Sequence, residues 1–140
     1  MKRLLPLPSA FLLIVILSAC TNYTGTPIEP NENNMIITIR NKANFDFHGL
    51  EVAILDHSQG GVNADGSIIE NNEELKFEFL REDFKSNGEE VEMEGIILTE
   101  SNGNRIPINK KVQLELENNK EIVFELTGNS INEAELIREN

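Results

Sequence analysis

The sequence predicts an all-β domain, an antiparallel sandwich of two sheets with about seven strands. From Met35 onward, apolar residues recur at every second position, which is the pattern of strands that bury one face. Turn-forming residues interrupt this pattern at intervals of roughly 8 to 12 residues. The patterned part, residues 35–140, has the length of one ordinary domain and can bury a core.

Each of the first three strands is predicted from three apolar residues at alternate positions. These are Met35, Ile37 and Ile39 in the first, Leu50, Val52 and Ile54 in the second, and Leu75, Phe77 and Phe79 in the third. A polar, turn-like break at residues 41–44 ends the first strand, and the second starts near Phe47. Residues 58–67, which include two adjacent glycines, are predicted to form a long loop.

A change of phase marks the next strand, predicted at residues 91–99. Its apolar residues are odd-numbered before Gly95 and even-numbered after it, so we expect a β-bulge at this glycine. The Asn-Gly pair within residues 101–104 predicts a hairpin turn into residues 105–108. Pro107 marks that short segment as an edge strand, because proline has no backbone N–H to donate to a neighbouring strand.

The C-terminal part of the chain predicts one more hairpin and leaves the last segment open. Its two strands are predicted from Val112, Leu114 and Leu116 and from Ile122, Phe124 and Leu126, with a turn at residues 118–120. Ser130 and Glu133 have the capping-box spacing of a helical turn. Residues 134–138 fit a last short strand equally well.

Short strands and frequent turns in one domain are typical of an immunoglobulin-like sandwich. The chain has one cysteine and no tryptophan, so the Cys…Trp…Cys pattern of antibody domains is absent. The expected likeness is therefore one of architecture, and a small barrel or a transthyretin-like sandwich is the alternative.

The N-terminal residues predict a secretion leader. Lys2 and Arg3 precede an apolar run from Leu4 to Leu17, which is the order of the charged and apolar regions of a signal peptide. A helix that crosses a bilayer needs about 20 apolar residues, and this run is shorter. We therefore expect a cleaved leader rather than a permanent transmembrane anchor.

The segment Leu17-Ser18-Ala19-Cys20 resembles the lipobox of bacterial lipoproteins. The resemblance implies a signal peptide at residues 1–19, cleavage between Ala19 and Cys20, and a diacylglyceryl thioether on the Cys20 sulfur. Because Cys20 is the only cysteine, no disulfide can form within one chain. Two or more acyl chains hold a protein lastingly on a bilayer, so the membrane is the expected partner, on its extracytoplasmic face. Residues 63–67 and 124–128 also look like parts of small Gram-positive lipoproteins with no assigned activity.

Residues 20–34 are predicted to be the lipidated cysteine and a flexible tether, because they contain few apolar side chains and several prolines and asparagines. Removal of residues 1–19 takes Lys2 and Arg3 with it. It leaves 10 of the 12 basic residues against 24 acidic ones, a net charge near −14. Such a chain is a poor ligand for nucleic acid, whose binding requires neutralisation of phosphates. Cationic partners are favoured only diffusely.

The residue types in this chain give little reason to expect a metal site or a catalytic site. If one regular strand joins His48 and His57, they lie roughly 30 Å apart on opposite faces and cannot share a metal ion. There is no G-x-S-x-G sequence, and no serine can be tied to a histidine and a carboxylate. We therefore predict no catalytic residue, no cofactor and no metal.

The predicted loop at residues 58–67 is the expected contact site, because recognition is usually carried by long loops at the end of a sandwich. Asn63, Asp65 and Ser67 alternate oxygen-bearing side chains and resemble part of a calcium-binding loop. The bidentate glutamate of such a loop is missing, so an ordinary connection is favoured over a calcium site.

Many glutamates occupy outward positions of the predicted strands, where they form solvated faces that discourage association between sheet edges. They are Glu89, Glu90, Glu92, Glu94, Glu115, Glu117 and Glu125. The first functional hypothesis is accordingly a non-catalytic binding or accessory module of the cell envelope, bound to an unidentified envelope protein or ligand. The alternative is an envelope enzyme with a carboxylate-based active site.

Overall fold

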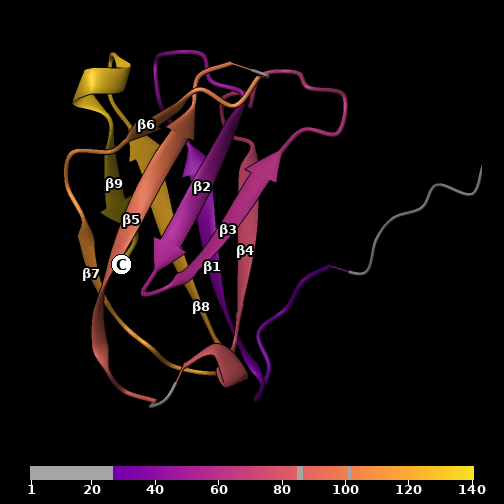
Figure 1. Cartoon of the computed structure of the whole chain (residues 1–140), viewed down its shortest axis with the longest axis vertical. Coiled ribbons are helices and arrows are strands. Elements are labelled where there is room, and N and C mark those ends of the chain that lie inside the picture. The colour runs from indigo at the N-terminus through magenta and orange to yellow at the C-terminus, as the bar shows by residue number, and fades with distance from the viewer. Residues whose placement is uncertain (1–26, 85–86, 101) are drawn as a thin grey trace, which may run out of the picture.

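The computed structural model describes residues 27–84, 87–100 and 102–140, and these residues form a sandwich of two β-sheets (Figure 1). The strands are β1 (Asn34–Asn41), β2 (Gly49–Ile54), β3 (His57–Val62), β4 (Glu74–Leu80), β5 (Glu90–Leu98), β6 (Arg105–Pro107), β7 (Val112–Glu115), β8 (Lys120–Thr127) and β9 (Glu135–Arg138). Two short 3-10 turns are η2 (Arg81–Asp83) and η3 (Ile131–Glu133). The predicted all-β, two-sheet architecture is confirmed. Its immunoglobulin-like character stays a prediction.

One sheet has four strands in the order β4-β1-β8-β9. The other has the order β3-β2-β5, and β6 and β7 pair with successive parts of the free side of β5. Every pair is antiparallel except β1 and β8, which are parallel and place Met35 opposite Lys120. The strand that opens the domain is therefore held at the centre of its sheet by strands from much later in the chain.

The core lies between the sheets and is made by the predicted apolar stripes. Phe47, Phe79 and Phe124 are fully buried in it, and burial of an aromatic or aliphatic side chain of this size contributes about 1.5–3 kcal/mol. Leu75 and Val112 are only partly buried. Alternation in the sequence thus identified the inward side of most strands.

The predicted β-bulge at Gly95 is wrong. β5 pairs with β2 in one unbroken register from Met93 opposite Ile54 to Leu98 opposite Gly49, and the buried residues stay odd-numbered throughout. A Cβ atom at Gly95 would lie 2.8 Å from Cδ1 of Ile108 and 3.0 Å from Cδ1 of Leu136. The side chains of Ile108 and Leu136 therefore fill the inward space at position 95. This explains why β5 has a glycine, with no side chain, at that position.

The predicted hairpin at residues 112–126 is also wrong. β7 pairs with β5 in one sheet, whereas β8 pairs with β1 and β9 in the other. The connection crosses between the sheets through Asn119, whose φ is +59°. The Asn119 N–H donates to the carbonyl oxygens of Asn31 and Asn34, both at 2.8 Å. Both strands face the same core from opposite sides, so their stripes look like those of a hairpin.

The predicted loop at residues 58–67 is wrong in its first half, because residues 57–62 form strand β3. β3 pairs with β2 in a hairpin that turns at Leu55 and Asp56. The chain between the two histidines is therefore not one straight strand. His48 precedes β2 and His57 lies opposite Ile54 at the other end of it.

Other local predictions are confirmed or refined. β6, with Pro107, is an edge strand, and Gly103 has φ +85° in the turn before it. The C-terminal segment, for which a helical turn and a strand were both predicted, contains both: the 3-10 turn η3 and then strand β9. Ser130 makes no side-chain cap hydrogen bond. The predicted tether is ordered where the Asn31 N–H donates to Oδ1 of Asn34 at 2.6 Å.

The strand directions give the sandwich two distinct ends. The chain from residue 27 runs down to the lower end of the sandwich in Figure 1, where β1 and β8 begin, and we call this the tether end. The connections that follow β1, β3, β5 and β8 gather at the opposite end, which we call the loop end (Figure 1).

Candidate functional site

Asn41, the last residue of β1, holds the loop end together from beneath. It is 4% exposed. Its Nδ2 donates to the carbonyl oxygens of Ile69, at 2.9 Å, and Glu70, at 3.1 Å, while its Oδ1 accepts from the Ala43 N–H at 2.9 Å. One buried amide thereby fixes the connections after β1 and β3 against each other. The sequence indicated only a polar break here, and an asparagine at the end of an apolar stripe was the one available signal.

The predicted contact residues Asn63, Asp65 and Ser67 come together in one turn at the loop end. Asn63 Nδ2 donates to Ser67 Oγ at 3.1 Å and to the Ile68 carbonyl at 3.0 Å, and the Ser67 N–H donates to Asp65 Oδ1 at 3.0 Å. The hydroxyl and N–H of Ser67 lower the pKa of Asp65. Gly66 allows the turn with φ +73°. These polar groups hold the shape of the turn by bonding one another.

A depression of about 530 Å³ lies between the connections after β1 and β3. Its lining residues are Asn41, Ala43, Asn44, Phe45, Asp46, Ile68, Ile69, Glu70 and Asn71. Phe45 and Ile68 supply apolar surface, and Val62, 60% exposed, adds more beside the Asn63 turn. Binding sites combine apolar surface with a few polar groups in this way. The depression is therefore the best candidate binding site, next to the predicted contact residues and not made by them.

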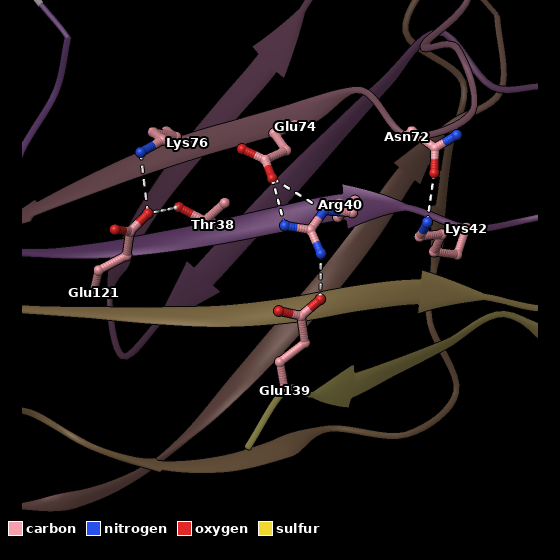
Figure 2. Close-up of polar contacts among 8 residues, drawn as sticks. All are labelled: Thr38, Arg40, Lys42, Asn72, Glu74, Lys76, Glu121 and Glu139. Carbon is pink, nitrogen blue, oxygen red and sulfur yellow. Dashed lines mark hydrogen bonds and ion pairs between the residues drawn. The ribbon is translucent and has the colours of Figure 1, made fainter.

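On the outer face of the four-stranded sheet, Arg40 of β1 joins two glutamates (Figure 2). Its Nη2 lies 2.7 Å from Glu74 Oε1 on β4, and its Nη1 lies 2.5 Å from Glu139 Oε1, just after β9. The hydrogen bond to Glu74 and the charge of Glu139 raise the pKa of Arg40. Nearer the loop end, Lys42 donates to Asn72 (Figure 2). Arg40 therefore links strands from both sides of β1.

Glu121 of β8 forms the second group on this face (Figure 2). Its Oε1 accepts from Thr38 Oγ1 at 2.6 Å and from Lys76 Nζ at 3.0 Å. The Thr38 hydrogen bond, and then Lys76, lower the pKa of Glu121. The charged side chains on this face are paired with one another. We therefore assign them a structural role rather than a role in ligand binding.

A smaller cavity of about 120 Å³ lies at the tether end. Its lining residues are Met35, Arg81, Phe84, Asn87, Leu116, Glu117 and Asn118. A water molecule occupies about 30 Å³ of liquid, so this space suits a few waters and not a ligand of ordinary size. It is a weaker candidate than the depression at the loop end.

The two histidines lie at opposite ends of the β2–β3 hairpin. His48 Nδ1 lies 2.9 Å from the Gly66 carbonyl oxygen. His57 Nδ1 lies 3.7 Å from Asp83 Oδ1, and its ring contacts Phe84 edge-on with centroids 5.9 Å apart. Within residues 27–84, 87–100 and 102–140, no three His, Cys, Asp or Glu side chains are grouped to hold a metal ion.

The glutamates that were predicted to face outward are exposed or half-exposed. In the described part of the chain, the buried polar residues are Asn34, Thr38 and Asn41, and no carboxylate is among them. A carboxylate active site would require two acidic groups that face each other in a cleft. A depression of about 390 Å³ on the outside of β5 is lined by Lys111 and four of these glutamates, Glu89, Glu90, Glu92 and Glu94. The enzyme hypothesis stays a prediction.

No protein family model matches the sequence. No curated protein matches it either. Among solved structures, the chain is similar to the NMR structure of a protein from Eubacterium rectale, with 11% sequence identity and a TM-score of 0.44. The similarity covers 81% of this chain and 96% of that one.

The residues expected to reach the membrane lie outside the described part of the chain. They are the signal peptide at residues 1–19, the cleavage site at Ala19 and Cys20, and the lipid acceptor Cys20. In the described part, no helix has the length and apolar character to cross a bilayer.

Proposed function

We propose that the chain is a membrane-anchored extracytoplasmic lipoprotein whose domain is a non-catalytic binding or accessory module of the cell envelope. Lipid on Cys20 anchors it, and the depression at the loop end, with the Asn63 turn beside it, is the contact surface. The proposal is supported first by the lipobox residues Leu17-Ser18-Ala19-Cys20.

The observation that carries the binding role is the position of the depression relative to the chain's N-terminal end. The turn at residues 31–34 is hydrogen-bonded to Asn119 at the tether end. The depression lies at the opposite end, beyond the full length of β1. A chain anchored through Cys20 would thus keep the depression clear of the tether, where an envelope partner has access.

The anchor is tested by cell fractionation of the wild-type chain and Cys20→Ala, with mass spectrometry of the mature N-terminus. We expect wild type in the membrane fraction with a diacylglyceryl adduct on Cys20, and Cys20→Ala without the adduct and outside that fraction. Membrane retention of Cys20→Ala, or an unmodified Cys20 in the native protein, would contradict the anchor.

The contact surface is tested separately with cross-linking through a photoreactive residue placed at Phe45 in the anchored protein. We expect a discrete adduct that Ile68→Glu abolishes, because the charge interrupts the apolar wall of the depression. The same photoreactive residue at Gln113, an exposed position on β7, is the control. Equal adducts from both positions would argue against the loop end as the contact.

A further inference from the structure

Strand β3 is a free edge of the larger sheet. It pairs with β2 on one side only. Among the described residues, no backbone hydrogen bond outside the ladders involves residues 57–62. A row of N–H and C=O groups on an open edge is a template for another strand.

This edge lacks the protection that the other outer strands carry. The residues of β3 are His57, Ser58, Gln59, Gly60, Gly61 and Val62, with no Asp, Glu, Lys or Arg, in a chain that is 26% charged. By contrast, β4 carries three charges, β9 carries two, and β6 contains Pro107. Charges and proline are the devices that keep edges apart.

The β3 surface also leaves room for a neighbouring backbone. A Cβ atom at Gly60 would meet nothing within 4 Å, and Val62 is 60% exposed. On the inner side, a Cβ at Gly61 would lie 3.4 Å from Leu75 and Phe77 of β4. The strand is thus supported from beneath by the other sheet and open along its edge, and glycine in a strand often marks close approach of another backbone.

We propose that β3 pairs antiparallel with β3 of a second copy of this chain around a two-fold axis, so that the two larger sheets become one. In such an interface the same residues serve both copies. When Gly60 of each copy lies opposite Gly60 of the other at the axis, residues 58–62 lie opposite residues of the same neutral strand, so the pairing places no like charges across the ladder. Among the described strands, no other sheet edge combines that neutrality with a length of six residues.

The chain that precedes the domain is compatible with this arrangement on one membrane. Antiparallel pairing places the two tether ends at opposite ends of the pair. With the two-fold axis perpendicular to the bilayer, the two tether ends lie equally far from it, and residues 21–26, which precede the described part, reach about 20–22 Å at full extension. Both copies can therefore reach the same bilayer. This point alone depends on the proposed lipid anchor.

The test is sedimentation velocity of the mature chain, residues 20–140, carrying Cys20→Ser, across protein concentrations. We expect a reversible dimer that tightens as salt is added, because screening weakens the repulsion between two copies with a net charge near −14. Gly60→Lys should weaken the dimer at least about tenfold, since it places like charges across the new ladder. Gly60→Ser, which is neutral, should leave it intact.

Ile137→Lys is the matched control, because it adds the same charge at an exposed position on β9 in the other sheet. Hydrogen exchange of residues 58–61 supplies a second readout, and the amides of this segment that point away from β2 should slow as the dimer forms. A monomer at every concentration and salt level would overturn the proposal, as would a dimer that Ile137→Lys disrupts and Gly60→Lys does not. The soluble variant keeps this result separate from any result on lipidation.

Discussion

The Thr38 hydroxyl of β1 donates a 2.6 Å hydrogen bond to the Glu121 carboxylate of β8, and so links two parallel neighbours that lie 83 residues apart in sequence. Lys76 of β4 donates to the same oxygen. Thr38 is 2% exposed, so the Glu121 carboxylate on the surface accepts a hydrogen bond from a buried hydroxyl.

Stability should fall in acid partly through Glu121. Its pKa is lowered in the folded state by the Thr38 hydrogen bond and by Lys76, so its contribution is present above the unfolded pKa of about 4.3 and is lost as pH falls through the folded pKa. We expect Glu121→Gln to lower the free energy of unfolding at pH 7 by about 1 kcal/mol or less. The loss should shrink below about pH 4. Urea unfolding between these pH values measures it. Glu133→Gln, which removes one negative charge at an exposed position, is the control.

Asn41→Ala should destabilise the loop end. The change leaves the Ile69 carbonyl and the Ala43 N–H without their partner, at a cost of about 1–3 kcal/mol, while the Glu70 carbonyl keeps its bond from the Glu73 N–H. Denaturant unfolding gives the free energy, and hydrogen exchange of the Ala43 amide reports the local effect. Asn44→Ala, which removes only an exposed hydrogen bond to Asn129, should cost much less. Equal losses from the two variants would contradict the role assigned to Asn41.

Gly95→Val should destabilise the core by overpacking, by about 1–3 kcal/mol. The new Cβ would lie 2.8 Å from Cδ1 of Ile108, so Ile108→Ala should relieve part of the clash in the double variant. A double-mutant cycle measured by thermal unfolding gives the coupling energy. If the two losses simply add, Gly95 does not face Ile108 in the way described.

Leu55→Asn should stabilise the protein. Leu55 has φ +52° at the tip of the β2–β3 hairpin and is 55% exposed, so it pays a conformational cost for little burial. Asparagine tolerates the left-handed region, and relief of the strain is expected to contribute about 1 kcal/mol. Leu80→Asn is the control, because Leu80 is also exposed but has φ −82°. A gain in melting temperature for Leu80→Asn and none for Leu55→Asn would refute the strain.

Much of the candidate site lay beyond prediction from the sequence. The predicted loop at residues 58–67 is present only in its second half, where Asn63, Asp65 and Ser67 form a turn through hydrogen bonds between near neighbours in the chain. Their role as contact residues stays a prediction. The depression beside it was not, because its walls come from two connections that Asn41 brings together through hydrogen bonds to residues 28 and 29 positions away. Nothing local to residues 43–46 or 68–71 indicates that they face each other.

The sequence alone determined the all-β class, the inward side of most strands and the edge position of β6, because side chains alternate between faces within a strand and proline cannot donate a ladder hydrogen bond. Only the tertiary structure decided which strands are neighbours. It placed β7 and β8 in different sheets, kept β5 regular through Gly95 and made β3 a strand. A period of two specifies a face but no partner, and partners are chosen by packing with residues far away in the chain.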